Sequence, residues 1–285
     1  DTDGADQAES SILRLSVQSA MRSLAPTDRE VLTLKQLGFD VVVFDKRDEI
    51  GGNLHVAKKP PFKGKFEWAI DYYKSMAKKL NITMKLGKEV TAQEVLALKP
   101  YSILVATGSN VISIPLEGLD QVQTVQAHDV LANDMQFANK KVVVIGGGIT
   151  GLETALYINR QGTNQVSVVD MLPEWPVDML DMRYQNEALL EVRHCNDQGV
   201  ALFYNNKVVK FADGKLFIES TKDGEVKELP ADVIVLSVGV KPNDALWQEL
   251  LASGHPSVWK AGDAIATGKI NKAVLHGSKF GYSLN

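Results

Sequence analysis

The stretch that decides the fold is VVVIGGGITG, residues 142–151. Its first four residues are apolar without alternation, which is typical of a parallel strand covered on both faces. The pattern GxGxxG follows directly. Its first glycine permits a tight turn, the second lets the backbone approach a diphosphate, and the third lets the next helix pack closely. Amide groups at the start of that helix attract phosphate oxygens. The candidate dinucleotide contacts are therefore Gly146, Gly148, Ile149, Thr150 and Gly151.

An acidic residue after the next expected strand makes this motif more specific. Asp170 follows the predicted strand 165–169, where its carboxylate can accept hydrogen bonds from ribose hydroxyls. The same charge would repel a 2′-phosphate, and Met171 and Leu172 supply no cation to neutralise one. The pattern predicts a NAD(H) site that favours NADH over NADPH. The alternative is a glycine-rich turn that serves packing alone.

Parts of this pattern occur twice in the chain. Residues 36–52 and 160–170 share the order helix end, glycine, strand and aspartate. The segments 103–108 and 233–239 are each an apolar strand that closes on a small residue and a glycine. The sequence therefore predicts an α/β protein with two related, Rossmann-like nucleotide-binding units.

The first unit has an aspartate after its strand but lacks the glycine turn. Asp45 follows a strand as Asp170 does, and is a candidate ribose ligand of a second dinucleotide. The positions equivalent to the three glycines hold Arg22, Leu24 and Thr27. A capping box at Thr27 instead predicts a helix over 27–37. We therefore expect the N-terminal unit to be atypical.

Hydrophobic patterning places the remaining elements. We expect strands at 41–44, 82–86, 102–106, 141–145, 165–169, 215–220, 226–229 and 233–238. We expect helices at 66–80 and 149–161, a hairpin near Asp223-Gly224, and a final turn and helix over 262–284. The segment 109–134 has little periodicity and is expected to be a connector.

Composition excludes several classes of function. The chain of 285 residues contains one cysteine, which rules out an internal disulfide, a Cys-x-x-Cys redox pair and a four-cysteine iron–sulfur cluster within it. Cys195 is expected to be a small packing residue. A net charge of −4 gives no reason to expect nucleic acid. With neither a long apolar run nor a signal-peptide pattern, we expect no membrane partner and a cytoplasmic location.

No catalytic triad or metal-ligand spacing is present, so no catalytic or metal-binding side chain is predicted. The basic segment 58–65 contains four lysines, which we expect to form a solvated face or docking edge: Lys58, Lys59, Lys63 and Lys65.

Several further motifs carry a family resemblance. They are Phe44-Asp45-Lys46, Gly51-Gly52-Asn53, the segment 55–60, the segment 105–109, the segment 239–243 and Ala261-Gly262-Asp263-Ala264. From Gly38 onward the chain resembles the flavin- and pyridine-nucleotide-binding portion of the old-yellow-enzyme-related reductases. That family includes 2,4-dienoyl-CoA reductase, enoate reductases and trimethylamine dehydrogenase.

The resemblance implies a two-dinucleotide-binding flavoprotein fold in which the second domain is inserted in the first. The implied FAD-binding domain covers 1–135 and 250–285, and the NAD-binding domain covers 136–249. The FAD contacts implied are Asp45, Lys46, Gly51, Gly52, Asn53, Thr107, Gly108, Gly262 and Asp263. Asp263 is the implied acceptor for a ribityl hydroxyl. Gly239 joins the implied NAD contacts.

The resemblance also implies a function, that of an electron-input module which transfers hydride from NADH to FAD. In the family, further centres then reduce unsaturated acyl substrates. Those centres are FMN in a TIM barrel and an iron–sulfur segment, and a domain or subunit of that kind is the implied partner. Residues 1–30 do not match the family's first strand and glycine turn. The alternative is therefore a NAD(H)-binding module, or an inactive variant, that does not retain FAD.

Overall fold

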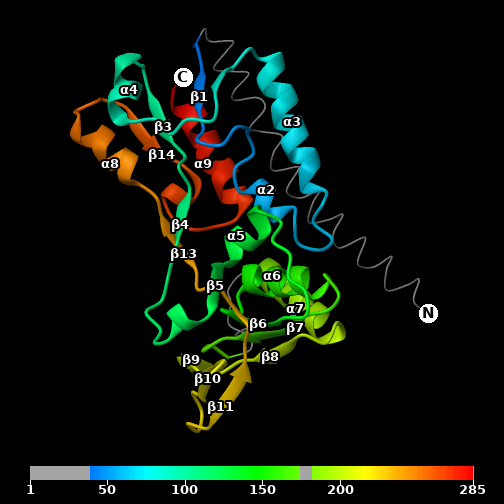
Figure 1. The fold of residues 1–285 in the computed structure, drawn as a ribbon. Helices are drawn as coiled ribbons and strands as arrows, with labels where there is room; N and C mark the ends of the chain where they lie inside the picture. The colour runs from blue at the N-terminus through cyan, green and yellow to red at the C-terminus, as the bar shows by residue number, and fades with distance from the viewer. Residues whose placement is uncertain (1–38, 174–181, 285) are drawn as a thin grey trace. The chain divides into compact units, whose positions relative to one another are not determined.

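A computed structural model describes residues 39–173 and 182–284 of the chain (Figure 1). The helix predicted at 27–37, and the three positions equivalent to the missing glycines, lie outside these residues. The chain divides into two compact units. Within the described residues, unit 1 comprises 39–54, 65–110 and 240–284, and unit 2 comprises 55–64 and 111–239.

Unit 2 is built on a five-stranded parallel sheet with the strand order β5-β12-β6-β7-β8. Its strands are β5 (Gln123–Gln126), β6 (Lys141–Ile145), β7 (Gln165–Val169), β8 (Ala201–Phe203) and β12 (Val233–Leu236). Leu236 of β12 lies opposite Ile145 of β6, so these two strands end at the same edge of the sheet. The predicted strands at 141–145, 165–169 and 233–238 are confirmed.

The two faces of this sheet are covered differently, as the alternation of side chains along a strand requires. Val142 and Val144 point into a core shared with α6 (Ile149–Asn159) and α7 (Met182–Asp197). Val143 and Ile145 point into a second core shared with β9 and β10. Because both faces are buried, β6 needs apolar residues at consecutive positions, which explains the apolar run Val142–Ile145.

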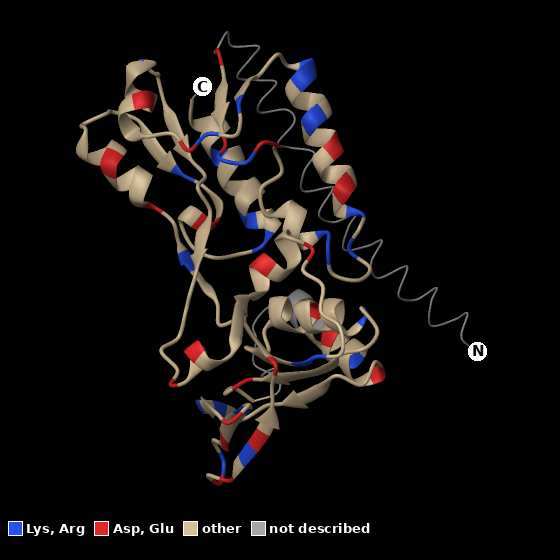
Figure 2. Cartoon of the chain, in the orientation of Figure 1, with Lys and Arg blue, Asp and Glu red and all other residues tan. Residues whose placement is uncertain are grey.

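The second core is closed by a three-stranded antiparallel sheet in the order β11-β10-β9. These strands are β9 (Asn206–Ala212), β10 (Lys215–Ser220) and β11 (Val226–Pro230). The hairpin predicted near Asp223-Gly224 is confirmed. Acidic and basic side chains are interspersed along it (Figure 2), and Lys215 pairs with Glu228 across the two strands.

Unit 1 contains two parallel strand pairs and the helices around them. One pair is β1 (Val42–Phe44) with β2 (Thr83–Lys85), and the other is β3 (Ile103–Val105) with β14 (Val258–Lys260). Its helices are α3 (Phe66–Lys79), α4 (Ala92–Ala97), α8 (Ala245–Ala252), the 3-10 turn η2 (Gly262–Ala264) and α9 (Ile270–Ser283). Helix α2 (Leu54–Ala57) lies where the chain passes from unit 1 to unit 2. Ile103 and Val105 pack with Leu250 in its core. The predictions of strands at 41–44, 82–86 and 102–106 and of helices at 66–80 and 262–284 are confirmed.

The prediction of a connector at 109–134 is wrong. This segment forms β4 (Ser109–Val111), η1 (Leu119–Gln121), β5 and α5 (Ala127–Ala132). β4 pairs with β13 (Val240–Pro242), and β5 is the edge strand beside β12. Because β5 belongs to the sheet of unit 2, the compact units divide at 110/111 and 239/240, whereas the sequence placed the boundaries at 135/136 and 249/250. Among the described residues, no helix is long and apolar enough to cross a bilayer.

Candidate functional site

The turn between β6 and α6 requires glycine at its first and last motif positions. Gly146 has a φ of 108°, and a Cβ there would lie 2.3 Å from the carbonyl oxygen of Ser237. A Cβ on Gly151 would lie 1.9 Å from the carbonyl oxygen of Gly146. Real Cβ atoms do not approach backbone oxygens so closely. These two glycines therefore allow α6 to begin tightly against the end of β6.

The middle glycine of the motif serves a different purpose. A Cβ on Gly148 would meet no described atom within 4 Å, and its φ is −65°. Packing therefore does not explain a glycine here, whereas close approach of a ligand to the backbone does. Gly148 is also the N-cap residue of α6, and no side-chain hydrogen bond caps the helix there. Amide groups of the first turn are thus available to an anion.

Asp170 lies against this turn. Its Oδ2 accepts a hydrogen bond from the Gly147 amide at 2.6 Å, and its Oδ1 accepts one from the Leu172 amide at 2.8 Å. The carboxylate is half-buried, and each oxygen keeps further lone pairs for a ribose diol. Met171 and Leu172 beside it are exposed.

Three residues outside the predicted site complete this arrangement: Gly147, Tyr204 and Ser237. A Cβ on Gly147 would lie 3.1 Å from the Cβ of Asp170 and 3.2 Å from the ring of Tyr204, so a side chain here would push against both residues. Ser237 supplies the carbonyl against Gly146 and places its Oγ near Gly151. The GGG run marked Gly147 for attention. Nothing local in the sequence connects Tyr204 or Ser237 to the turn.

The remaining NAD candidates lie at the same edge of the sheet. Ile149 and Thr150 form the first turn of α6, with Thr150 exposed and Ile149 half-buried. Gly239 follows β12, is exposed, and has a φ of 104°; its carbonyl accepts a hydrogen bond from the Ile112 amide at 3.0 Å. Ligands of open α/β sheets bind at the carboxyl ends of neighbouring strands such as β6 and β12.

In unit 1, a first group of the FAD candidates is linked through Arg47. Asp45 follows β1, and its Oδ1 accepts a hydrogen bond from the Arg47 amide at 2.9 Å. The Arg47 guanidinium donates to the carbonyl oxygen of Gly52. Gly51 and Gly52 have φ values of 125° and 50°, which favour glycine. Lys46 and Asn53 are exposed. Arg47 was absent from the predicted site, although it is next to Lys46 in the sequence.

A second group lies where β3 and β14 end side by side. Thr107 donates its hydroxyl proton to the carbonyl of Asn243, and the Gly108 carbonyl accepts from the Asn243 amide at 2.9 Å. Gly108 and Gly262 have φ values of 75° and 60°.

Asp263 connects this second group to β4. Its Oδ2 accepts from the Ser109 hydroxyl at 3.3 Å, and its Oδ1 accepts from the Gly268 amide at 3.0 Å. The amide of the preceding Gly262 donates to Nδ1 of His276 at 3.1 Å. The structure therefore brings together the candidates that follow β3 and those that follow β14.

The prediction for the lysine segment is wrong for Lys63. Its ammonium group forms ion pairs with Glu153 of α6 and, at 3.2 Å, with Glu187 of α7, and its side chain is 15% exposed. Burial alone would lower the pKa of Lys63, but the carboxylates of Glu153, Glu187 and Glu191 outweigh it and raise the pKa. Lys59 pairs with Asp134.

Burial raises the pKa of Glu153 to about 7, and Lys63 opposes that rise. A folded-state pKa above the ordinary 4.5 means that this group stabilises the fold below pH 4.5 and loses that contribution as the pH rises through about 7. Glutamine is neutral at every pH. The free energy of unfolding of Glu153→Gln, relative to that of the original protein, should therefore rise by about 3 kcal/mol as the pH increases from 4.5 to 8. Urea unfolding at several pH values measures this difference. A constant difference across that range would contradict a raised pKa.

Cys195 is fully buried, and its Sγ lies 3.8 Å from the carbonyl oxygen of Leu152. Burial raises its pKa to about 12, so its thiol is not a nucleophile near neutral pH. The prediction of a packing residue is confirmed. We expect iodoacetamide to leave the native protein unmodified and to alkylate it fully in urea, as mass spectrometry would show. Rapid modification of the native protein would contradict this environment.

The geometry of both units agrees with comparisons to known proteins. The family model described as pyridine nucleotide-disulphide oxidoreductase matches residues 31–275. The chain belongs to this family. Its single cysteine excludes an internal disulfide relay, so the family's fold is present here without the redox disulfide.

Individual relatives make the assignment narrower. The chain is 34% identical to a bilirubin reductase of Mediterraneibacter gnavus over 72% of its own length and 31% of the relative's. It is 29% identical to an NADH oxidase of Thermoanaerobacter brockii, over 89% of its own length and 38% of the relative's. A solved 2-naphthoyl-CoA reductase complex is 27% identical, with a TM-score of 0.78 over 90% of this chain and 38% of that one.

These relatives confirm the predicted resemblance to the old-yellow-enzyme-related reductases, and with it the two-dinucleotide-binding flavoprotein fold. A pyridine nucleotide and FAD are the cofactors of this family. The chain spans about a third of the length of the curated relatives named above.

Proposed function

We propose that the chain is the electron-input module of an NADH-dependent flavin oxidoreductase. The observation that carries the proposal is the phosphate turn at the start of α6, with Asp170 hydrogen-bonded to it through Gly147. This arrangement combines an open backbone position, available helix amides and a ribose-binding acid at one sheet edge. In a glycine turn that serves packing alone, an open position such as Gly148 would not need to be glycine.

The residues of unit 2 would hold NADH. Amides of Gly148, Ile149 and Thr150 would bind the diphosphate, and the Asp170 carboxylate would accept hydrogen bonds from the adenosine ribose. Asp170 and its exposed neighbours Met171 and Leu172 disfavour a 2′-phosphate, which supports NADH over NADPH. Gly239 would let the nucleotide pass close to the end of β12.

The described residues of unit 1 fit FAD. Asp45 would bind its ribose, the turn at Gly51–Asn53 would approach it, and Thr107, Gly108, Gly262 and Asp263 would line its ribityl side. When both nucleotides are bound, they supply hydride transfer from the nicotinamide to the flavin. That step needs no side-chain acid or base, so the protein's part is to bind and orient.

The electron acceptor is proposed from the relatives. Bilirubin reductase and 2-naphthoyl-CoA reductase are named for unsaturated substrates, and this chain matches only about a third of each. We propose that electrons leave this module for a domain or subunit of the TIM-barrel type that carries FMN and an iron–sulfur centre. An unsaturated acyl compound would be the final acceptor.

An anaerobic absorbance titration tests the proposed function. The chain, purified and then supplied with FAD, should show a protein-bound flavin band that bleaches on addition of NADH, and much less with NADPH. A colourless protein that enhances NADH fluorescence would be a nucleotide-binding module instead. A protein that gives neither signal, even after reconstitution with FAD, would overturn the proposal.

Asp170 provides a test of nucleotide choice. Asp170→Asn keeps the shape and removes the charge, so NADH affinity should fall about tenfold while the preference over NADPH narrows. Fluorescence titration with both nucleotides measures these changes. Asp263→Asn, in unit 1, is the matched control and should leave NADH affinity within twofold. Equal losses for the two variants would contradict the assigned role.

A further inference from the structure

Residues 55–64 are grouped with unit 2, although the chain on both sides of them is grouped with unit 1. This segment, which we call the strap, is held on unit 2 at three points. Lys59 pairs with Asp134 after α5. The ring of Phe62 lies 4.4 Å from the Arg160 guanidinium and 5.1 Å from the ring of His194. Lys63 forms ion pairs with Glu153 of α6 and Glu187 of α7.

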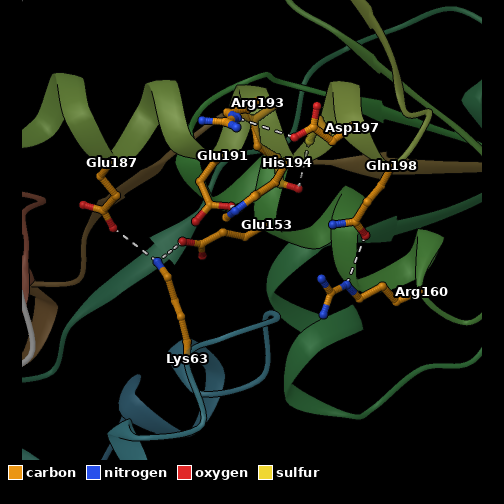
Figure 3. Close-up of polar contacts among 11 residues, drawn as sticks. Lys63, Glu153, Arg160, Glu187, Glu191, Arg193, His194, Asp197 and Gln198 are labelled. Carbon is orange, nitrogen blue, oxygen red and sulfur yellow. Dashed lines mark hydrogen bonds and ion pairs between the residues drawn. The ribbon is translucent and has the colours of Figure 1, made fainter. Parts of the chain in front are cut away.

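The third point of attachment, at Lys63, is the strongest of the three. Figure 3 shows the Lys63 ammonium directed at Glu153 and Glu187, with Glu191 beside them. Glu153 and Glu191 are buried. One ammonium group therefore interacts electrostatically with three carboxylates, which are carried by the packed helices α6 and α7. Without it the Glu153 charge would be buried without its ion-pair partner, which costs far more than an exposed pair contributes.

Backbone geometry also indicates that contacts with unit 2 hold the strap in a defined conformation. Phe62 has a φ of 67°, an unfavourable conformation for a bulky side chain. Such a conformation persists only where surrounding contacts hold it. The contacts on either side are the Phe62 ring between Arg160 and His194, and the Lys63 ion pairs.

The strap follows directly on the proposed flavin turn. The Leu54 amide donates to the carbonyl of Gly51 at 2.9 Å, and Leu54 begins α2, whose remaining residues belong to the strap. On its other side the turn is held by Arg47 through the Gly52 carbonyl. Hydrogen bonds within unit 1 therefore hold the Gly51–Asn53 turn on both sides, and the chain continues from it directly into the strap.

We infer that the strap positions the Gly51–Asn53 turn for flavin binding, and that Lys63 is the positioning residue that fastens it. This inference rests on the proposed function for its flavin part alone. Lys63 lies outside both sets of proposed nucleotide contacts and acts through the strap.

The experiment compares Lys63→Met with Lys59→Met in the full chain. Lys59→Met removes the more exposed ion pair of the same strap and is the matched control. Chymotrypsin cleavage after Phe62 reports release of the strap without any cofactor. We expect Lys63→Met to accelerate that cleavage about tenfold or more, and Lys59→Met less than threefold.

Binding titrations then separate positioning from general damage. Lys63→Met should raise the Kd for FAD at least fivefold and change the Kd for NADH less than twofold, because the NADH turn lies on α6 itself. Glu153→Gln keeps an acceptor oxygen for Lys63 and should retain both the protection of the strap and the FAD affinity. Unchanged cleavage in folded Lys63→Met, or equal losses for FAD and NADH, would overturn the inference.

Two further outcomes are also decisive. If Lys63→Met does not fold, hydrogen exchange of the original protein tests the strap. The amides of Lys59 and Lys63, which donate to Val56 and Pro60, should exchange about a hundredfold more slowly than free peptide. Exchange at the free rate would overturn the inference. If the original protein binds no FAD, the proposed function fails, while the cleavage result still supports or overturns the strap.

Discussion

Gly151→Ala should lower the free energy of unfolding by about 3 kcal/mol and weaken NADH binding at least about tenfold. The added methyl group would lie 1.9 Å from the Gly146 carbonyl oxygen and 3.3 Å from the Ser237 Oγ. The first of these is backbone, so it cannot rotate away. Helix α6 would have to move from the end of β6, and the amides proposed to bind the diphosphate would move with it. Urea unfolding and NADH fluorescence titration measure the two effects.

Gly148→Ala separates binding from folding. Its methyl group would meet no described atom within 4 Å and requires no unusual φ. Its unfolding free energy should stay within about 0.5 kcal/mol of the original value, while NADH affinity still falls because the diphosphate can no longer approach the backbone. Equal stability for Gly151→Ala and Gly148→Ala would contradict the packing account of the turn. Unchanged NADH affinity in Gly148→Ala would contradict the binding account.

Lys63→Met should be the most destabilising change outside that turn. It leaves Glu153, Glu187 and Glu191 between two packed helices without their shared cation, and removal of one partner of a buried ion pair costs about 3 to 5 kcal/mol. The loss should be larger at pH 8 than at pH 5.5, because the Glu153 carboxylate, whose pKa is raised by burial, becomes protonated as the pH falls. Urea unfolding at the two pH values measures the loss.

Two control variants make this prediction specific. Lys59→Met, which breaks a more exposed pair, should cost less than about 1 kcal/mol. The double variant Lys63→Met with Glu153→Met should recover much of the lost stability, since an apolar pair replaces a broken ionic one. A Lys63→Met protein as stable as Lys59→Met would contradict the shared-cation account.

The parts of the fold that the sequence predicts well are those whose cause is local. The run 142–145 is buried on both faces of the sheet, and the glycines after it are required by contacts only a few residues away. Asp170 could be placed because β6 and β7 are neighbours both in sequence and in the sheet. For the same reason the hairpin at Asp223-Gly224 was predicted correctly.

The parts that the sequence did not predict depend on distant partners. β5 has the short sequence QTVQ. It forms a strand because it pairs in parallel with β12, which lies far along the chain. Lys63 resembles its exposed lysine neighbours in sequence, yet it is buried because α6 and α7 place three glutamates around it. Arg47 and Tyr204 act by contacts with residues that only folding brings near. Composition and spacing do not encode such contacts.

A crystal structure of the chain with bound NADH tests the central claim most directly. We predict that the diphosphate lies at the start of α6 against the amides of Gly148 and Ile149. A carboxylate oxygen of Asp170 should lie about 2.6–3.2 Å from a hydroxyl of the adenosine ribose. NADH bound at another site, or bound with Asp170 turned away from the ribose, would contradict the account.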